Sequence, residues 1–129
     1  MANKIDYGAS LEILDRLPVT VVDTYKSLVR CGWRFWIVDS VRGYCSYARK
    51  EITIPLWAYN KSAEYYTWYF CHEMAHALSP IGSNHGPEFM ATLIRICPEN
   101  AIKHELGYKP RNAASAGIGE VKFIDISMI

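Results

Sequence analysis

The sequence predicts an α+β fold in which helices pack on a small, three-stranded antiparallel sheet. Three observations lead to this prediction: an amphipathic stripe at residues 18–31, three short β-rich runs between residues 33 and 55, and a long apolar helix ending near residue 78. The chain has 129 residues, of which 50% are hydrophobic, enough for the core of one domain. We place that domain at residues 1–110 and interpret residues 111–129 as a linker and a hydrophobic C-terminal tail.

The charge of the chain is nearly balanced. Fourteen basic residues stand against 13 acidic ones, for a formal net charge of +1, so composition gives no reason to expect nucleic acid or an anionic membrane as a partner. Residues 1–8 lack the basic start and apolar run of a signal peptide, and no stretch is long enough to span a bilayer. We therefore expect no membrane association and a cytoplasmic location, or the host cytoplasm for a viral protein.

Four cysteines are spread along the chain without a Cys-x-x-Cys pair, which excludes a cysteine zinc ribbon. In a reducing compartment we expect four mostly buried thiols. They are Cys31, Cys45, Cys71 and Cys97.

The first firm helix is expected at residues 18–31, after a short helix or turn at residues 9–17. Pro18 suits the first helical position, and Gly32 is a typical helix stop. Apolar residues recur between them at helical spacing and predict one buried stripe. The stripe consists of Val21, Val22, Tyr25, Leu28 and Val29.

Three strands are expected at residues 33–39, 44–48 and 51–55, because these runs are rich in aromatic and β-branched residues. A turn at Arg42 and Gly43 separates the first two. We expect the three to form an antiparallel meander, which Pro55 ends because proline cannot donate to a ladder.

The next helix is expected to begin after a cap at Asn60 or Ser62 and to run to about Leu78. Its second half is apolar on all sides apart from histidines and a glutamate, which is typical of a helix at the centre of a domain. A further helix is predicted between Pro87 and Pro98, with one apolar stripe at residues 89, 93 and 96 and another at residues 90, 94 and 97, and a short one at residues 99–106. Residues 107–119 read as a linker, and residues 120–129 as a strand for this sheet or for another molecule.

The central helix carries the sequence His-Glu-x-x-His. On a helix His72 and His76 lie on one face, about 6 Å apart along the axis, a spacing from which two imidazoles can meet on one metal ion. Glu73 projects beside the metal, where a base for a metal-bound water must stand. Zinc is the expected metal, because three imidazoles with an open fourth position suit a catalytic zinc.

A third ligand is needed, and His85 is our choice. It lies nine residues after His76, beyond a loop with Pro80, Gly82 and Gly86 that allows the chain to turn back. The alternatives have simpler interpretations as solvated helix residues or, for the histidine, as a surface residue near a helix end. These alternatives are Glu88, Glu99, Glu105 and His104.

Residues 33–97 resemble the SprT-like zinc metallopeptidases, which include the Spartan and Wss proteases of DNA–protein crosslink repair. The shared signature is His-Glu-x-x-His, a loop and His-Gly-x-x-Phe, present here at residues 72–76 and 85–89. The resemblance implies a minimal zincin fold, here without the cysteine zinc ribbon of the family, and protein substrates that include DNA-associated proteins. It implies zinc bound by His72, His76 and His85, Glu73 as general base, and Phe89 as a packing residue.

The expected activity is zinc-dependent hydrolysis of peptide bonds. Glu73 would take a proton from the attacking water and pass it to the leaving amine. We expect the substrate to add as an extended strand along residues 51–55. The donor that stabilises the oxyanion is left open among Tyr44, Tyr47, Tyr65, Tyr69 and Asn84.

Two other functions are considered. The chain could be a non-catalytic zincin-fold binding or inhibitor protein, phage-encoded in view of its compact size, with the apolar segment at residues 121–129 as its contact. A zinc-dependent endoribonuclease would carry three histidines at related spacing but would lack the glutamate at position 73. Residues 30–50 combine basic and aromatic side chains, which can bind single strands, or form a plain sheet with its aromatics inward. The sequence does not determine the oligomeric state.

Overall fold

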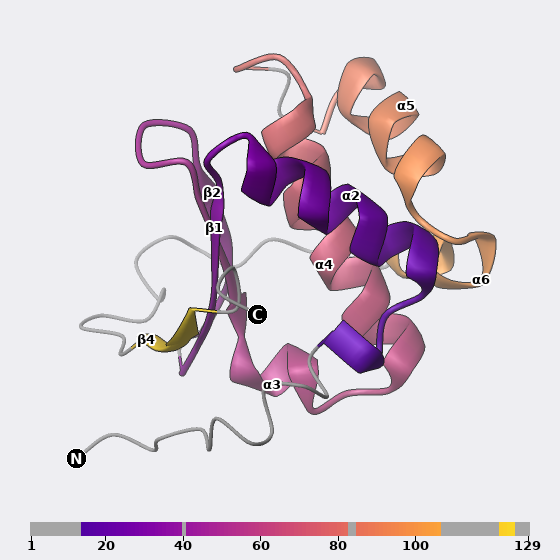
Figure 1. Cartoon of the computed structure of the whole chain (residues 1–129). Helices are drawn as coiled ribbons and strands as arrows, with labels where there is room; N and C mark the ends of the chain where they lie inside the picture. Colours follow the sequence, from indigo (N-terminus) through magenta and orange to yellow (C-terminus); the bar gives the residue numbers. More distant parts are fainter. Residues whose placement is uncertain (1–13, 40, 83–84, 107–121, 126–129) are drawn as a thin grey trace.

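The computed structural model describes residues 14–39, 41–82, 85–106 and 122–125, and within these ranges it confirms the α+β class. Helices α2, α4 and α5 lie on one side of the sheet (Figure 1). The helices are α2 (Val19–Arg30), α3 (Leu56–Tyr59), α4 (Ala63–Leu78), α5 (Pro87–Ile96), α6 (Glu99–Ile102) and the 3₁₀ helix η2 (Lys103–Glu105). The strands are β1 (Arg34–Val38), β2 (Tyr44–Ser46), β3 (Glu51–Pro55) and β4 (Lys122–Asp125).

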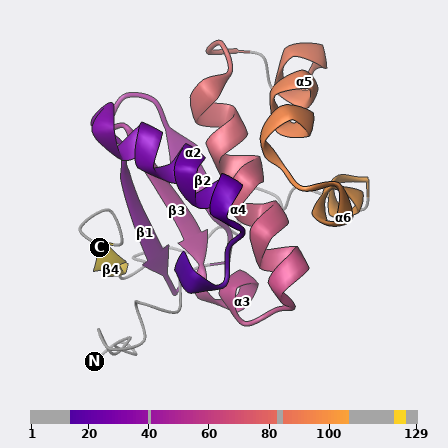
Figure 2. The ribbon, with the colours of Figure 1, turned by 45° about the vertical axis from the view of Figure 1, so that its right-hand side comes forward.

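The sheet is mixed and has the order β2-β3-β1-β4, so the predicted antiparallel three-stranded meander is wrong. β1 pairs with β3 in parallel, from Arg34 opposite Glu51 to Val38 opposite Pro55 (Figure 2). β2 is antiparallel to β3 alone. Residues 122–125 of the tail form a fourth strand that is antiparallel to β1. The boundary at residue 110 stays a prediction, and the predicted linker at residues 107–119 lies outside the described residues.

The connection from β1 to β2 explains why the sheet is mixed and not the predicted antiparallel meander. Because β2 pairs with β3 and not with β1, the chain after Val38 must cross the carboxyl end of β3 before it turns back. Gly43 permits this crossing, since a Cβ atom there would lie 2.2 Å from the carbonyl oxygen of Thr53. The turn signal at Arg42 and Gly43 is therefore real, but it marks a crossing connection rather than a hairpin.

Helix α2 ends in a Schellman motif at Gly32. The glycine has φ +96°, its N–H donates to Val29 O at 3.0 Å, and the N–H of Trp33 donates to Leu28 O at 3.0 Å. Of the predicted stripe, Val21, Tyr25 and Leu28 are buried, and Val22 and Val29 are partly buried. The predicted helix and its stop are confirmed.

Helix α4 is the buried centre of the fold. The Ser62 hydroxyl accepts the N–H of Tyr65 at 3.2 Å and caps the helix, and every residue from Tyr66 to Ala75 is buried. Phe70 stacks on Phe35 of β1 with ring centroids 5.4 Å apart. Such packing fixes the position of side chains on this helix, because a close-packed interior resists displacement.

The last helices follow the prediction in part. In α5 the stripe of Phe89, Leu93 and Ile96 is buried, but Ile94 of the second predicted stripe is 63% exposed. The predicted helix at residues 99–106 consists of α6 followed by η2, and α3 was not predicted. In the described part of the chain, no helix has the length and apolar character needed to cross a membrane.

Candidate metal centre

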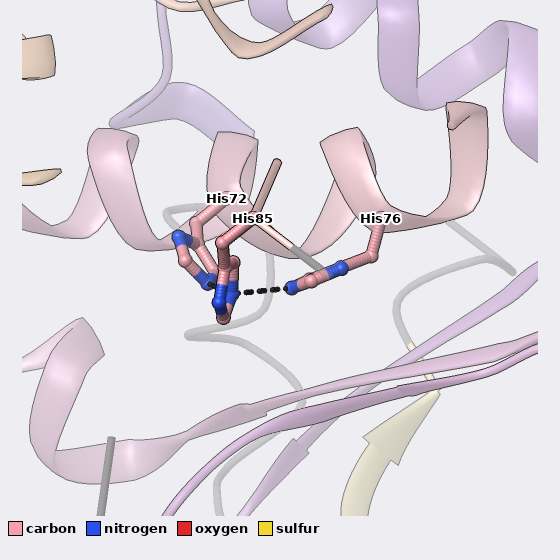
Figure 3. Close-up of side chains that lie close together, drawn as sticks. All are labelled: His72, His76 and His85. Atoms are coloured by element: carbon pink, nitrogen blue, oxygen red, sulfur yellow. Dashed lines mark hydrogen bonds between the residues drawn. The ribbon is translucent and has the colours of Figure 1, made fainter. Parts of the chain in front are cut away.

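Three histidines, two from α4 and one from a loop, converge beside the C-terminal half of α4. His72 and His76 project from the same side of the helix, and His85 reaches them from the loop before α5 (Figure 3). The Nε2 atom of His85 lies 3.0 Å from Nε2 of His76 and 3.2 Å from Nε2 of His72. The three side chains are close enough to hold a metal ion, and their ligand atoms all lie within 4.8 Å of one another.

The backbone of His85 is in the left-handed region, with φ +61°. For a residue other than glycine this conformation costs about 1–2 kcal/mol. Strain of this kind persists where surrounding contacts hold it, and it concentrates at functional sites. His85 is the most exposed of the three histidines, while His72 is buried and His76 is half-buried.

The buried ring of Phe89 packs against all three imidazoles. Its centroid lies 5.1 Å from that of His72, 4.5 Å from that of His76 and 4.9 Å from that of His85. Phe89 lies in the first turn of α5, so the start of this helix braces the cluster. The packing role that the resemblance implies for Phe89 agrees with these contacts.

The environment of His76 and His85 favours the neutral form of both imidazoles. Burial lowers the pKa of His76 to about 4, with further contributions from His72 and His85. Burial and the neighbouring His72 also lower the pKa of His85. Because the neutral ring is the form that binds a metal, both histidines are ready to act as ligands at neutral pH.

Glu105 contacts His72 on the side of the ring that faces away from the other two histidines. Its Oε1 atom lies 2.7 Å from Nδ1 of His72, on the ring edge opposite the converging Nε2 atoms, and accepts the indole N–H of Trp68 at 2.9 Å. Burial acts to raise the pKa of Glu105, but the hydrogen bonds from His72 and Trp68 and the charges of His72 and His85 outweigh it and lower the pKa. Sequence reasoning considered Glu105 only as a rival ligand. No pattern links it to His72, which lies 33 residues earlier.

His104, the one histidine among the alternative ligands, is half-buried and is not the solvated surface residue that was expected. Its ring lies against Tyr65 and Trp68, with centroid distances of 5.1 Å and 6.1 Å. Its Nε2 atom is buried and has no hydrogen-bond partner. It does not belong to the group of described residues that could hold a metal.

Glu73 is buried beside the histidines and is 4% exposed. Burial raises the pKa of its carboxyl to about 7, although the charges of His72 and Arg42 act in the opposite direction. A carboxyl that titrates near neutral pH is well suited to accept a proton and return it.

The cluster and Glu73 open onto one pocket of about 270 Å³. β2, an edge strand of the sheet, supplies part of its wall through Tyr44 and Cys45. β3, the strand expected to receive a substrate, is paired on both sides, so it cannot accept a further strand. The other described lining residues are Arg42, Gly43, Tyr47 and Gly82.

The candidate oxyanion donors differ in whether they line the pocket. Tyr44 and Tyr47 line the pocket, and the Tyr47 hydroxyl donates to the carbonyl oxygen of His76. The Tyr69 hydroxyl accepts the N–H of Gly43, and Tyr65 packs against Trp68 with ring centroids 5.2 Å apart. Asn84 lies outside the described residues. Of the four candidate tyrosines, Tyr44 and Tyr47 line the pocket, and Tyr65 and Tyr69 do not.

The basic and aromatic residues near β1 do not form one open platform. Trp33 and Phe35 are buried, which removes them as surfaces for base stacking. The guanidinium of Arg34 lies 5.2 Å from the ring centre of Trp36, whose indole N–H donates to Glu51 at 3.1 Å. For Trp33 and Phe35 the structure agrees with the alternative of a plain sheet whose aromatic side chains point into the core.

The cysteines are all free. Cys71 and Cys97 are buried, as expected, whereas Cys45 is half-buried and Cys31 is exposed. The expectation of buried thiols is therefore wrong for Cys31.

Fold and site together define an α+β protein with a three-histidine cluster beside a buried glutamate. No protein-family model, no curated protein and no solved structure matches the chain. The resemblance to SprT-like metallopeptidases therefore stays a prediction that rests on the residues of the motif.

Proposed function

We propose that the chain is a zinc-dependent metallopeptidase. The observation that carries this proposal is the shared pocket: the Nε2 atoms of His72, His76 and His85 converge there, and the carboxylate of Glu73 opens onto the same space. Metal ligands and a group that can transfer a proton are the two elements that metal-assisted hydrolysis of an amide uses.

Zinc fits the donor set. Three neutral imidazole nitrogens are common ligands of catalytic zinc, and they leave a coordination position open. A zinc ion held by these residues would supply a Lewis acid that polarises the substrate carbonyl and activates water.

Glu73 performs the proton transfers in this proposal. Its raised pKa lets it take a proton from the attacking water near neutral pH and deliver that proton to the leaving amine. Arg42, whose charge acts on Glu73 together with that of His72, opposes the effect of burial on the pKa of this carboxyl.

The edge strand β2 is the proposed docking site for the substrate backbone. An extended peptide that adds to this edge would form main-chain hydrogen bonds and lie along the wall of the pocket. This replaces the earlier expectation for residues 51–55. DNA-associated protein substrates and a cytoplasmic location also belong to the proposal and rest on the resemblance and the sequence.

The first test is the metal content per chain, measured by mass spectrometry on wild type and His85→Ala purified side by side. The proposal requires close to one zinc ion in wild type and a clear loss in the variant. Zinc retained by His85→Ala would place the third ligand elsewhere.

The second test measures cleavage of unfolded and DNA-bound proteins by wild type and Glu73→Gln. The expected result is cleavage by wild type and a loss of at least about 100-fold in the variant, since general base catalysis contributes about 10²–10⁴-fold. Zinc binding with equal inactivity of both proteins would favour a binding or inhibitor protein. RNA cleavage that survives Glu73→Gln would favour an endoribonuclease.

A further inference from the structure

One oxygen atom of Glu105 accepts two hydrogen bonds from α4. The imidazole Nδ1 of His72 lies 2.7 Å away and the indole Nε1 of Trp68 lies 2.9 Å away. The side chains of His72 and Glu105 are only 3% and 10% exposed. Hydrogen bonds to a carboxylate in such a setting are strong and directional, because little water competes for them.

The contact decides which nitrogen of His72 carries the proton. In its neutral form the His72 imidazole has one N–H group, and because a carboxylate can only accept, that proton resides on Nδ1. The Nε2 atom is then left with a lone pair, which points toward His85 at a distance of 3.2 Å. The opposite tautomer would place a hydrogen on Nε2 and block that atom as a ligand.

Trp68 keeps the carboxylate in place. It lies one helical turn before His72 on the buried side of α4, so both donors come from one rigid helix. Lys103, the cation nearest to Glu105 in sequence, instead contacts Glu64 at 3.2 Å. The charge of Glu105 is therefore directed at His72 and not at a surface ion pair with Lys103.

We propose that Glu105 is a positioning residue that holds His72 as the Nδ1–H tautomer and orients its ring for a metal ion, with Trp68 fixing the carboxylate. The metal part of this inference rests on the proposed function, whereas the tautomer is a property of the metal-free protein. Partners of this kind on ligand histidines typically change metal affinity by 10–100-fold.

The first experiment assigns the tautomer of His72 in metal-free protein by two-bond ¹H–¹⁵N correlation spectroscopy. Wild type should show the Nδ1–H pattern, and Glu105→Ala should shift His72 toward Nε2–H. Glu105→Gln should retain the wild-type pattern, because its amide oxygen still accepts. Glu99→Gln, a substitution in the neighbouring α6, is the matched control and should change nothing.

The second experiment measures zinc affinity by competition with a chromophoric chelator. We expect affinity to fall by about 10–100-fold in Glu105→Ala. A smaller loss is expected in Glu105→Gln and in Trp68→Phe, which preserves the ring but removes the N–H. Circular dichroism of each metal-free variant verifies the fold, and the conservative variant Glu105→Gln separates positioning from folding because it keeps the shape of the side chain.

An Nε2–H pattern for His72 in wild type would overturn the inference, as would an unchanged tautomer in folded Glu105→Ala. Zinc binding without peptidase activity would remove the proposed reaction but leave the role of Glu105 intact. If wild type bound no zinc, the proposed function would fail, and the tautomer alone would decide whether Glu105 positions His72.

Discussion

The backbone N–H of Gly43 donates a 2.8 Å hydrogen bond to the buried hydroxyl of Tyr69. This bond ties the connection between β1 and β2, which crosses the end of β3, to helix α4. Its acceptor, Tyr69, lies one helical turn before Glu73. On the other side of Arg42, the indole N–H of Trp57 donates to Val41 O at 2.8 Å. The pocket wall at Arg42 is thus fixed from both sides by aromatic side chains.

Gly43→Ala should destabilise the protein severely. The added methyl would meet Thr53 O at 2.2 Å and the side chains of Pro55 and Tyr69 at 3.0 Å, and the backbone oxygen cannot move without breaking the sheet. We expect a loss of about 3 kcal/mol or more in the free energy of unfolding, measured by urea denaturation.

The control for this prediction is Gly82→Ala. A Cβ atom at Gly82 would meet nothing within 4 Å, although its φ of +91° still disfavours a side chain. The expected loss is about 1–2 kcal/mol, the cost of a left-handed residue alone. Equal losses in the two variants would contradict the close approach at Gly43.

Replacing His85 should reveal the strain in its backbone. Because the residue has φ +61°, His85→Gly should be more stable than His85→Ala by about 1 kcal/mol in metal-free protein. Both variants lack the imidazole and should lose the metal equally. Thermal unfolding in the presence of a chelator measures the difference, and His85→Ala at least as stable as His85→Gly would argue against a left-handed backbone there.

Glu73 should make the metal-free protein less stable as pH rises. The pKa of this acid is raised from 4.5 to about 7 in the folded state, so between these values the native protein holds a proton that the unfolded chain has released. Stability therefore falls across this window, and Glu73→Gln should gain on wild type by up to about 3 kcal/mol near pH 8.

The comparison with Glu73→Gln is needed because His76 acts in the opposite direction. Its pKa is lowered from 6.5 to about 4 on folding, so stability is lost as pH falls through that range. Chemical denaturation of wild type and variant at a series of pH values isolates the Glu73 contribution. A difference that does not grow between pH 5 and pH 8 would contradict the raised pKa.

The thiols should react in the order of their exposure. Exposed Cys31 should be modified rapidly by an aromatic disulfide reagent. Cys45 should react slowly, because burial and the nearby Glu73 raise its pKa to about 12 and thus suppress the thiolate. The buried Cys71 and Cys97 should react only on unfolding. Rapid modification of any thiol in folded Cys31→Ser would contradict this assignment.

Local signals in the sequence were sufficient for most of the elements. Ser62 and Pro87 mark where α4 and α5 begin, and Gly32 marks where α2 ends, because caps and breakers act over only a few residues. The His-Glu-x-x-His spacing likewise placed two imidazoles on one helix face, since helix geometry alone determines that relation.

Local patterns could not predict the strand order or the contact between Glu105 and His72. The strand order could not be predicted, because a turn signal at Gly43 is equally compatible with a hairpin and with a connection that crosses a third strand. Glu105 had no signal either, since a carboxylate 33 residues from His72 belongs to no motif.

The sequence by itself determined the α+β class, the helix that carries the metal motif, and the choice of His72, His76 and His85 as candidate ligands. Tertiary structure alone decided which strand forms the wall of the pocket, the burial that raises the pKa of Glu73, and the partner of His72. The physical reason is the separation along the chain. Caps, periodicity and motif spacing depend on neighbouring residues, whereas strand pairing, burial and the hydrogen bond between Glu105 and His72 depend on residues that only folding brings together.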